Sequence, residues 1–546
     1  MKLKTFKYIV PAAVALVISL GMTSCADELS QSITDPQTNT TFDPDGTLAK
    51  IYGSLHLTGT TGGSGNADMS QFDEGNSAFF RRIFEANELG SDECIWTWQG
   101  DAGIPEMTNL SWNSSHGYNE LTYYRIMYNI TLCNFYLDET EGNTEAKMLQ
   151  NRAEVRFLRA YFMTQFIDLY GKAPFKEHFS SELPVEMSRV DAFNYVVKEL
   201  KAINGENADA KEVLLDNANS DTNYGRADKV AANLLLARLY LNAGVYTGTP
   251  QWQEAMNYAN KVINSGYSLN KNAKNGFSAY EQLFMGDNGE NPNARQEIIF
   301  PIRCDVNSRS YGGSLYPIAS TTGDGTPTQG LASAQWTCNR AREAMVAKFF
   351  SDFNNVPMVN DPHEVAKAAK DDRALFFSGA AEDGSKKRTI STEEKTTFAA
   401  GLGIMKWTNN HADGTASKDP AWPDTDVPLF RVAEAYLTLA EANFRLGGEN
   451  SITLNAINEL RNRAHAEPLT EVKERDIIDE WCREFYFEGR RRSDLIRFGL
   501  FTSGSYLWDW KGGSYAGNGV SNIYNLYPIP ANELNANSNM HQNPGY

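Results

Sequence analysis

The stretch from Ile477 to Gly499 reads IIDEWCREFYFEGRRRSDLIRFG, and the expected fold follows from it. Trp481 stands four residues before Phe485, and Cys482 stands three before it. A helix would place these side chains on one face, because residues three and four apart are neighbours on a helix surface. The stretch therefore predicts a helix with a buried aromatic face.

Charged residues crowd the same stretch. Three glutamates recur at four-residue steps among several arginines: Glu480, Glu484, Glu488, Arg483, Arg490, Arg491 and Arg492. Unlike charges beside aromatics predict a helix packed among other helices, with paired charges and Arg stems lying on apolar surface. We favour structural ion pairs over a catalytic role for these carboxylates. Such a helix needs helical partners elsewhere in the chain.

Helical hairpin patterns recur along the chain. Apolar spacing predicts helices over 121–138, 144–170, 226–243, 252–264, 430–446 and 453–464. Glycines follow as helix stops at Gly171, Gly244, Gly266 and Gly447. Two segments, Ala231–Ile263 and Ala433–Ala464, show the small-and-large residue spacing of tetratricopeptide hairpins at a period of roughly 34 residues. We expect a mostly α protein built as a tetratricopeptide-like solenoid of helical hairpins.

An irregular region interrupts this pattern. Residues 268–426 are rich in Gly, Asn and Thr and hold few long helical patterns. We expect a loop-rich lobe that carries the ligand site, since binding residues concentrate on loops held by a rigid scaffold. The predicted plan is one domain over 46–546, with a scaffold at about 118–266 and 427–500 and a lobe at about 58–112 and 268–426.

The N-terminus predicts export. Lys2, Lys4 and Lys7 precede the apolar run Ile9–Leu20, which is too short to span a bilayer, and small residues lead to Cys25. Residues 1–24 are therefore a predicted signal peptide that resembles a bacterial lipoprotein signal, and 25–45 a polar tether. Acyl chains such as palmitate on Cys25 would anchor the protein without a membrane helix. The alternative is ordinary cleavage with a structural Cys25.

Charge and cysteine content restrict the partners. A net charge of −18 disfavours nucleic acid and anionic lipid as partners.

Aromatic residues make up 12% of the chain, and a surplus of aromatic rings suits ligands with flat apolar faces. The cysteines after Cys25 show no CxxC pair and no metal-ligand spacing, so we expect mostly buried thiols: Cys94, Cys133, Cys304, Cys338 and Cys482.

Catalytic motifs are scarce. His363-Glu364 lacks the second histidine of HExxH, and no GxSxG motif occurs. The chain holds 68 acidic residues, so a glycosidase carboxylate pair is not excluded by counting. We expect a protein that is not an enzyme. A glycoside hydrolase is the alternative, and a scaffold that binds another protein is a third hypothesis.

Aromatic residues in loops are the candidate ligand contacts. Trp96 and Trp98 lie within Ser91–Asp101, Tyr311 precedes two glycines, and Trp336 lies in a later loop. The apolar face of a pyranose stacks on an aromatic ring, and by analogy with nucleic-acid bases each stack contributes about 1–3 kcal/mol. Core packing is the alternative for any single tryptophan.

One oxygen-rich loop is a candidate calcium site. Asp287, Asn288 and Glu290 lie in the sequence DNGENPN, and hard cations prefer oxygen ligands. A solvated loop is the alternative, because the spacing does not follow the EF-hand. No cofactor is expected to be required.

Several motifs resemble the SusD/RagB-like family from one end of the chain to the other. They are EFYFEGRRRSDLIRFG, NELGSDECIWTWQGD, GRADKVAANLLLARLYLNAGVYTG, PDTDVPLFRVAEAYLTLAEA, YLWDWKGG and YPIP. The tryptophan loop is similar to that of starch-binding members. The resemblance implies a tetratricopeptide-containing surface lipoprotein of the outer membrane that covers a SusC-like TonB-dependent transporter, alongside other surface glycan-binding lipoproteins. It implies binding of starch and malto-oligosaccharides without cleavage, and the alternative becomes a surface glycoside hydrolase acting on α-glucan.

The resemblance also assigns site residues. Trp96, Tyr311 and Trp336 match an aromatic arc that follows the curve of an α-1,4-glucan. Asp73 and Arg81 match hydroxyl partners. Asp101 stands where we expect an amide, and a carboxylate accepts hydrogen bonds from hydroxyls but cannot donate them.

Overall fold

The computed structural model describes residues 41–59, 63, 67–207, 209–323, 325–379 and 388–546. The chain forms two compact units, 1–46 and 47–546, and the following account concerns the second. The predicted signal peptide and Cys25 lie outside the described residues. Within the described part, no helix combines the length and the apolar character needed to cross a membrane.

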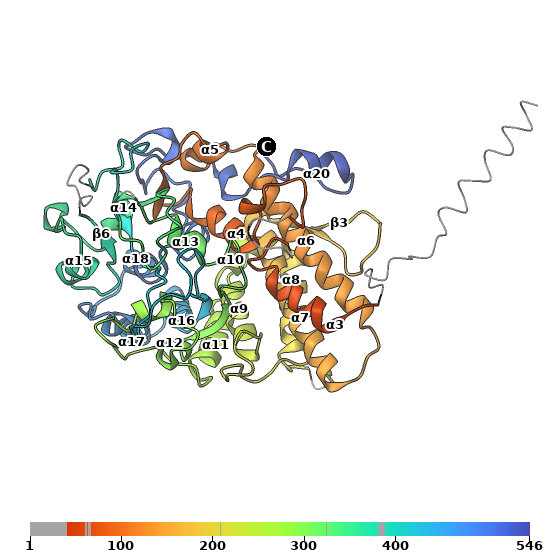
Figure 1. Cartoon of the computed structure of the whole chain (residues 1–546). Helices are drawn as coiled ribbons and strands as arrows, with labels where there is room; N and C mark the ends of the chain where they lie inside the picture. Colours follow the sequence, from red (N-terminus) through yellow and green to blue (C-terminus); the bar gives the residue numbers. More distant parts are fainter. Residues whose placement is uncertain (1–40, 60–62, 64–66, 208, 324, 380–387) are drawn as a thin grey trace, which may run out of the picture. The chain divides into compact units, whose positions relative to one another are not determined.

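Stacked helices form the scaffold, in which each helix packs on the next (Figure 1). In order they are α6 (Gly117–Glu139), α7 (Ala146–Gln165), α8 (Arg189–Ile203), α9 (Lys229–Leu241), α11 (Trp252–Ile263), α16 (Ala433–Arg445), α17 (Asn450–Arg463) and α18 (Glu474–Phe485). The two predicted tetratricopeptide-like segments are the hairpins α9–α11 and α16–α17, and α11 packs directly on α16. The mostly α, hairpin-stacked fold is therefore confirmed.

The helices differ from the prediction at two ends and by one additional helix. Gly244 does not stop a helix but lies within α10 (Ala243–Thr247), and Gly248 at φ 76° is the C-cap. Phe430 lies in a strand, β8 (Val427–Arg431), before α16 begins. The helix α8 was not predicted, although the Ser188 side chain accepts a hydrogen bond from the backbone N–H of Asp191 as an N-cap should.

The larger part of the predicted lobe, between α11 and α16, contains only short elements among its described residues. They are η4 (Glu281–Phe284), α12 (Pro292–Arg295), β4 (Ile298–Ile302), α13 (Leu315–Ala319), β5 (Asn339–Ala341), α14 (Glu343–Val346), η5 (Phe353–Asn355), α15 (Pro362–Ala369), β6 (Phe376–Phe377) and β7 (Gly403–Ile404). Strands β4 and β8 pair antiparallel, with Ile298 opposite Arg431 and Ile302 opposite Val427. This pairing joins the start of the lobe to its end, so the insertion leaves and re-enters the scaffold at one place.

The remaining elements lie before α8 or after α18. They are α3 (Pro44–Gly53), η2 (Glu74–Asn76), α4 (Phe79–Glu88), β1 (Cys94–Trp96), α5 (Ile104–Asn109), η3 (Phe166–Tyr170), β2 (Lys172–Phe175), β3 (Val185–Ser188), α19 (Arg491–Arg497), η6 (Lys511–Gly513), η7 (Asn522–Asn525) and α20 (Ala531–Ala536). The η3 turn continues α7 as a π-helix up to Gly171, whose φ of 67° ends it as predicted. Strands β2 and β3 pair with each other, as do β6 and β7.

The stretch 477–499 forms two helices joined by a tight turn. Helix α18 buries Trp481, Cys482 and Phe485, as predicted. The chain then turns through Phe487 at φ 58° and Gly489 at φ 78°, and α19 begins at Arg491. A Cβ on Gly489 would lie 3.0 Å from a backbone atom of α4, so the close approach of the turn to α4 favours glycine.

Buried ion pairs hold the stretch in place. Arg431 contacts Glu484 at 2.5 Å and Glu488 at 2.6 Å. Arg373 contacts Glu480 at 2.7 Å and Glu484 at 3.1 Å. Burial alone would raise the pKa of Glu480, but the surrounding arginines outweigh it and lower the pKa to about 2. The structural interpretation of these carboxylates is confirmed. The five cysteines after Cys25 are free and buried, also as predicted.

Candidate functional site

A cavity of about 640 Å³ opens where the loops before α6 meet those of the lobe, and we call it the groove. It is lined by Phe72, Asp73, Gly75, Asn76, Arg81, Trp96, Trp98, Asp101, Ala102, Gly117, Tyr118, Leu121, Tyr311 and Trp336. All six residues predicted as substrate contacts lie in this lining: Asp73, Arg81, Trp96, Asp101, Tyr311 and Trp336. The fold thus brings together residues from two distant parts of the sequence, 73–101 and 311–336.

Strand pairing places two of the tryptophans. Strand β1 pairs antiparallel with β5, and Trp96 stands opposite Asn339. Just beyond the pair, the Thr97 N–H donates to the Cys338 carbonyl at 2.7 Å. Because Trp336 lies two residues before Cys338, this ladder brings its loop beside the Trp96 loop.

A glycine places Tyr311. Gly312 lies so close to the start of α4 that a Cβ would come within 1.8 Å of the Ala78 Cβ. Only glycine fits this contact. Tyr311 therefore lies over the turn that carries Asp73, where a Cβ on Gly75 would be 3.5 Å from its ring.

Six aromatic side chains form a continuous series, which we call the aromatic row. Successive ring centroids lie 6.0, 6.3, 6.4, 6.0 and 5.5 Å apart along Trp98, Trp96, Tyr316, Trp336, Tyr311 and Trp422. These separations are those of interacting aromatic pairs. Sequence reasoning did not identify Tyr316 or Trp422 as neighbours of the groove, because nothing local to either residue marks it.

Two neighbouring tryptophans have different exposure. Trp96 is only 3% exposed, while Trp98 is 38% exposed. The Trp96 ring stacks on Tyr316 at 18° and lies perpendicular to the Trp98 ring. Its Nε1 donates to Asp101 Oδ2 at 3.3 Å. The resemblance matched Trp96 to the aromatic arc. Trp96 does lie in the groove lining, but Trp98 has the larger exposed surface of the two.

Polar groups border the aromatic row. Arg81 donates from Nε to Glu85 Oε1 at 2.8 Å, and its guanidinium lies 4.7 Å from the Tyr316 ring centroid and 5.7 Å from that of Trp336. Burial opposes the charge of Arg81, but Glu85 outweighs burial and raises its pKa. Exposed Asp73 accepts from the N–H and Nδ2 of Asn76, both at 3.2 Å. A guanidinium donor and carboxylate acceptors are thus held at the groove, where they suit a ligand bearing hydroxyl groups.

Other lining residues were missed by sequence reasoning. Phe72 and Asn76 lie near Asp73 in the sequence, while Tyr118 and Leu121 come from the first two turns of α6. Phe72 and Asn76 could have been found from the sequence, because Asp73 beside them is a predicted ligand contact. The α6 residues could not, because helical spacing does not show which face of a helix meets a ligand.

The predicted calcium residues have structural partners. Asp287 accepts from the N–H groups of Ala412 at 2.8 Å and Asp413 at 3.2 Å. The Asn288 amide donates to two backbone carbonyls, each at 2.8 Å, and Glu290 is exposed. Across the described residues, no group of three His, Cys, Asp or Glu side chains converges as a metal site would require. Calcium at Asp287, Asn288 and Glu290 stays a prediction.

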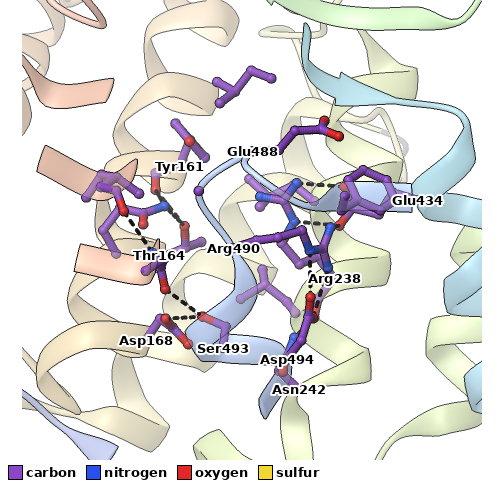
Figure 2. Close-up of a pocket in the computed structure, with 18 of the residues that line it drawn as sticks. Tyr161, Thr164, Asp168, Arg238, Asn242, Glu434, Glu488, Arg490, Ser493 and Asp494 are labelled. Atoms are coloured by element: carbon purple, nitrogen blue, oxygen red, sulfur yellow. Dashed lines mark hydrogen bonds and ion pairs between the residues drawn. The ribbon is translucent and has the colours of Figure 1, made fainter. Parts of the chain in front are cut away.

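A second cavity of about 80 Å³ lies inside the helical scaffold (Figure 2). Its charges are paired: both Arg238 Nε and Nη2 lie 2.7 Å from the Glu434 carboxylate, and Arg490 lies 3.1 Å from it. Ser493 donates to Asp168 at the opposite wall. Small-molecule sites usually measure about 300–1,000 Å³, whereas a space this small accommodates a few water molecules. This inner cavity is therefore too small for a sugar, and the groove is the candidate ligand site because it holds all the predicted contact residues.

Solved structures share this fold. A SusD-like protein from Bacteroides fragilis aligns over 94% of this chain and 100% of its own, with a TM-score of 0.67 and 18% identity. Surface glycan-binding protein A from Bacteroides thetaiotaomicron, solved in complex with laminarihexaose, aligns over 92% of this chain and 98% of its own, with a TM-score of 0.64 and 19% identity. At this identity the likeness is one of fold.

Two relatives share higher sequence identity with this chain than these solved structures do. The SusD family model matches residues 296–546. SusD-like protein P25 of Formosa agariphila is 26% identical over 76% of each chain. The starch-binding protein SusD of Bacteroides thetaiotaomicron is 47% identical over 100% of both chains. This chain belongs to the SusD family.

Proposed function

We propose that this protein binds starch and malto-oligosaccharides, the α-1,4-glucans, without cleaving them. One observation carries the proposal: the groove combines stacked aromatic rings with a fixed guanidinium and carboxylates, in a chain 47% identical to a starch-binding protein along its full length. A pyranose offers an apolar face and a rim of hydroxyls, and the groove has a counterpart for each.

The binding mode follows from the side chains. Trp98, Tyr311 and Trp336 offer aromatic surface to successive sugar faces. Arg81 donates to hydroxyl oxygens, and Asp73 and Asp101 accept from hydroxyl hydrogens. Stacked sugars stay partly in water, so affinity for one short segment is modest, and a polymer gains through repeated contacts.

The location and handling of the ligand are part of the proposal. Acylated Cys25 would hold the protein on the outer face of the outer membrane through the tether of residues 25–45. The bound glucan would pass to a SusC-like TonB-dependent transporter, with other surface glycan-binding lipoproteins nearby. The family resemblance supports this arrangement, and the charge of −18 argues against nucleic acid as a partner.

Affinity electrophoresis tests the function. The chain from residue 26 onward is run through gels with and without amylopectin, with dextran and a β-glucan as controls. We expect retardation by amylopectin alone and no release of reducing sugar. Hydrolysis that a single Asp or Glu substitution abolishes would favour the alternative, a surface glycoside hydrolase. Migration unaffected by every polysaccharide would contradict the starch assignment.

A further inference from the structure

The aromatic row continues past the groove. Tyr311 lies 6.0 Å from Trp336 on one side and 5.5 Å from Trp422 on the other, measured between ring centroids. Trp336 lines the groove, whereas Trp422 does not. The half-buried Trp422 ring therefore lies beyond the end of the groove that Tyr311 forms.

The loop of Trp422 is fixed beside the loop of Trp336. The Ser333 N–H donates to the Pro420 carbonyl at 2.9 Å and so ties the two loops together. Within its own loop, the backbone N–H of Trp422 donates to Asp419 Oδ1 at 3.2 Å. The loop backbone that carries the ring is thus held in place before any ligand arrives, which reduces the ordering cost of binding.

Polar groups accompany this ring as they accompany the groove. The Arg309 guanidinium lies 5.8 Å from the Trp422 ring centroid and 3.6 Å from Asp419 Oδ2. The Arg309 side chain is 53% exposed and that of Asp419 is 23% exposed, so both are open to a ligand. A ring, a guanidinium and a carboxylate repeat the chemistry that Trp336, Arg81 and Asp73 offer inside the groove.

We propose that Trp422, Arg309 and Asp419 form an additional sugar subsite that extends the groove beyond Tyr311. The subsite takes the next pyranose of an α-1,4-glucan already held in the groove, so it recognises chain length. Gly63 lies against one edge of the Trp422 ring, where a Cβ would come within 2.7 Å of Cη2, so a sugar meets the surface that this edge contact leaves open. The inference rests on the proposed glucan-binding function.

Calorimetric titration of the chain from residue 26 onward with maltotriose and maltoheptaose tests the subsite. Trp422→Ala should weaken maltoheptaose binding by about five-fold or more, the effect of losing one stacking contact, and leave maltotriose binding unchanged. Arg309→Ala should give a smaller loss, again only for maltoheptaose. Phe179→Ala, which removes a 55% exposed ring that does not line the groove, is the matched control and should change neither.

The outcomes separate the two hypotheses. Equal losses for both oligosaccharides would mean that Trp422 only supports Tyr311, and no loss for either would mean that it lies outside the ligand path; both results overturn the subsite. If the unaltered chain binds neither oligosaccharide, the proposed function itself fails. Thermal unfolding checks that Trp422→Ala remains folded, and Arg309→Ala decides the question if it does not.

Discussion

Arg491 and Asp92 form a buried bidentate ion pair, with Nε 2.7 Å from Oδ1 and Nη2 3.0 Å from Oδ2. In the turn between α18 and α19, the Phe487 N–H donates to Glu93 Oε2 at 2.8 Å. Asp92 and Glu93 open the loop that carries Trp96 and Trp98. The C-terminal helices and the tryptophan loop, nearly 400 residues apart (Asp92 to Arg491), thus hold each other.

Breaking the Arg491 pair should destabilise the protein. Arg491→Met leaves Asp92 buried without its cation, and loss of one partner of a buried pair costs about 3–5 kcal/mol of unfolding free energy. Urea denaturation measures the loss. The double variant Asp92→Asn/Arg491→Met should recover part of it, because no charge remains unpaired. A change below about 1 kcal/mol in the single variant would show that the pair contributes little.

The two tryptophans of the loop should give different phenotypes. Trp98→Ala should weaken binding of malto-oligosaccharide by about five-fold or more while the unfolding temperature stays the same, because the ring is 38% exposed. Trp96→Ala removes a ring that is 3% exposed and should lower the unfolding free energy by about 3–5 kcal/mol. Titration and denaturation of each variant distinguish the roles. Full binding by Trp98→Ala would contradict the stacking role.

Glu88 and Glu93 should make stability depend on pH. Burial raises the pKa of both, and for Glu93 the neighbouring Glu88 raises it further. The folded state therefore keeps a proton that the unfolded state loses above its ordinary carboxyl pKa of about 4.3. Stability should fall as pH rises from that value toward the raised pKa of the folded state.

Replacing Glu93 tests this pH dependence. Glu93→Gln cannot ionise but retains an oxygen for the Phe487 N–H, so the decline in unfolding temperature between about pH 5 and 8 should become shallower. The exposed Glu177→Gln is the control and should leave the slope unchanged. Identical slopes for Glu93→Gln and the parent chain would mean that Glu93 does not keep a proton in the folded state.

Cys25 should decide membrane attachment. Cys25→Ala removes the thiol that acyl chains would modify, and the protein should move from the membrane fraction to the soluble fraction. Cell fractionation followed by detection of the protein measures this. Cys133→Ala, which alters a buried thiol within α6, is the control and should stay with the membrane. Continued membrane retention of Cys25→Ala would count against a lipid anchor at this position.

Chelation should leave the fold intact. Asp287 and Asn288 already make hydrogen bonds to backbone groups, so the loop does not depend on a cation for its partners. Thermal unfolding with EDTA and with excess Ca²⁺ should give the same midpoint within about 1 °C. A clear rise with Ca²⁺ that Asp287→Asn abolishes would establish the calcium site and show that it stabilises the lobe.

Local spacing was enough to predict the helical scaffold. The three- and four-residue steps of apolar side chains, such as Trp481 and Phe485, directly reflect the helix period. The sequence also predicted that the carboxylates of this stretch form ion pairs, since so many buried charges need partners. The sequence also indicated candidate ligand contacts, because aromatic residues beside polar residues in predicted loops are unusual.

Only the tertiary structure decided which ring is exposed at the groove. Trp96 and Trp98 are two residues apart in the same loop, and the sequence contains nothing that assigns one of them to the interior. The pairing of β1 with β5 and the packing of Tyr316 bury Trp96 and leave Trp98 open. Trp422 likewise joins the aromatic row through the contact between Ser333 and Pro420. Helix formation depends on neighbours within one or two turns, whereas burial of a particular ring depends on contacts between segments distant in sequence.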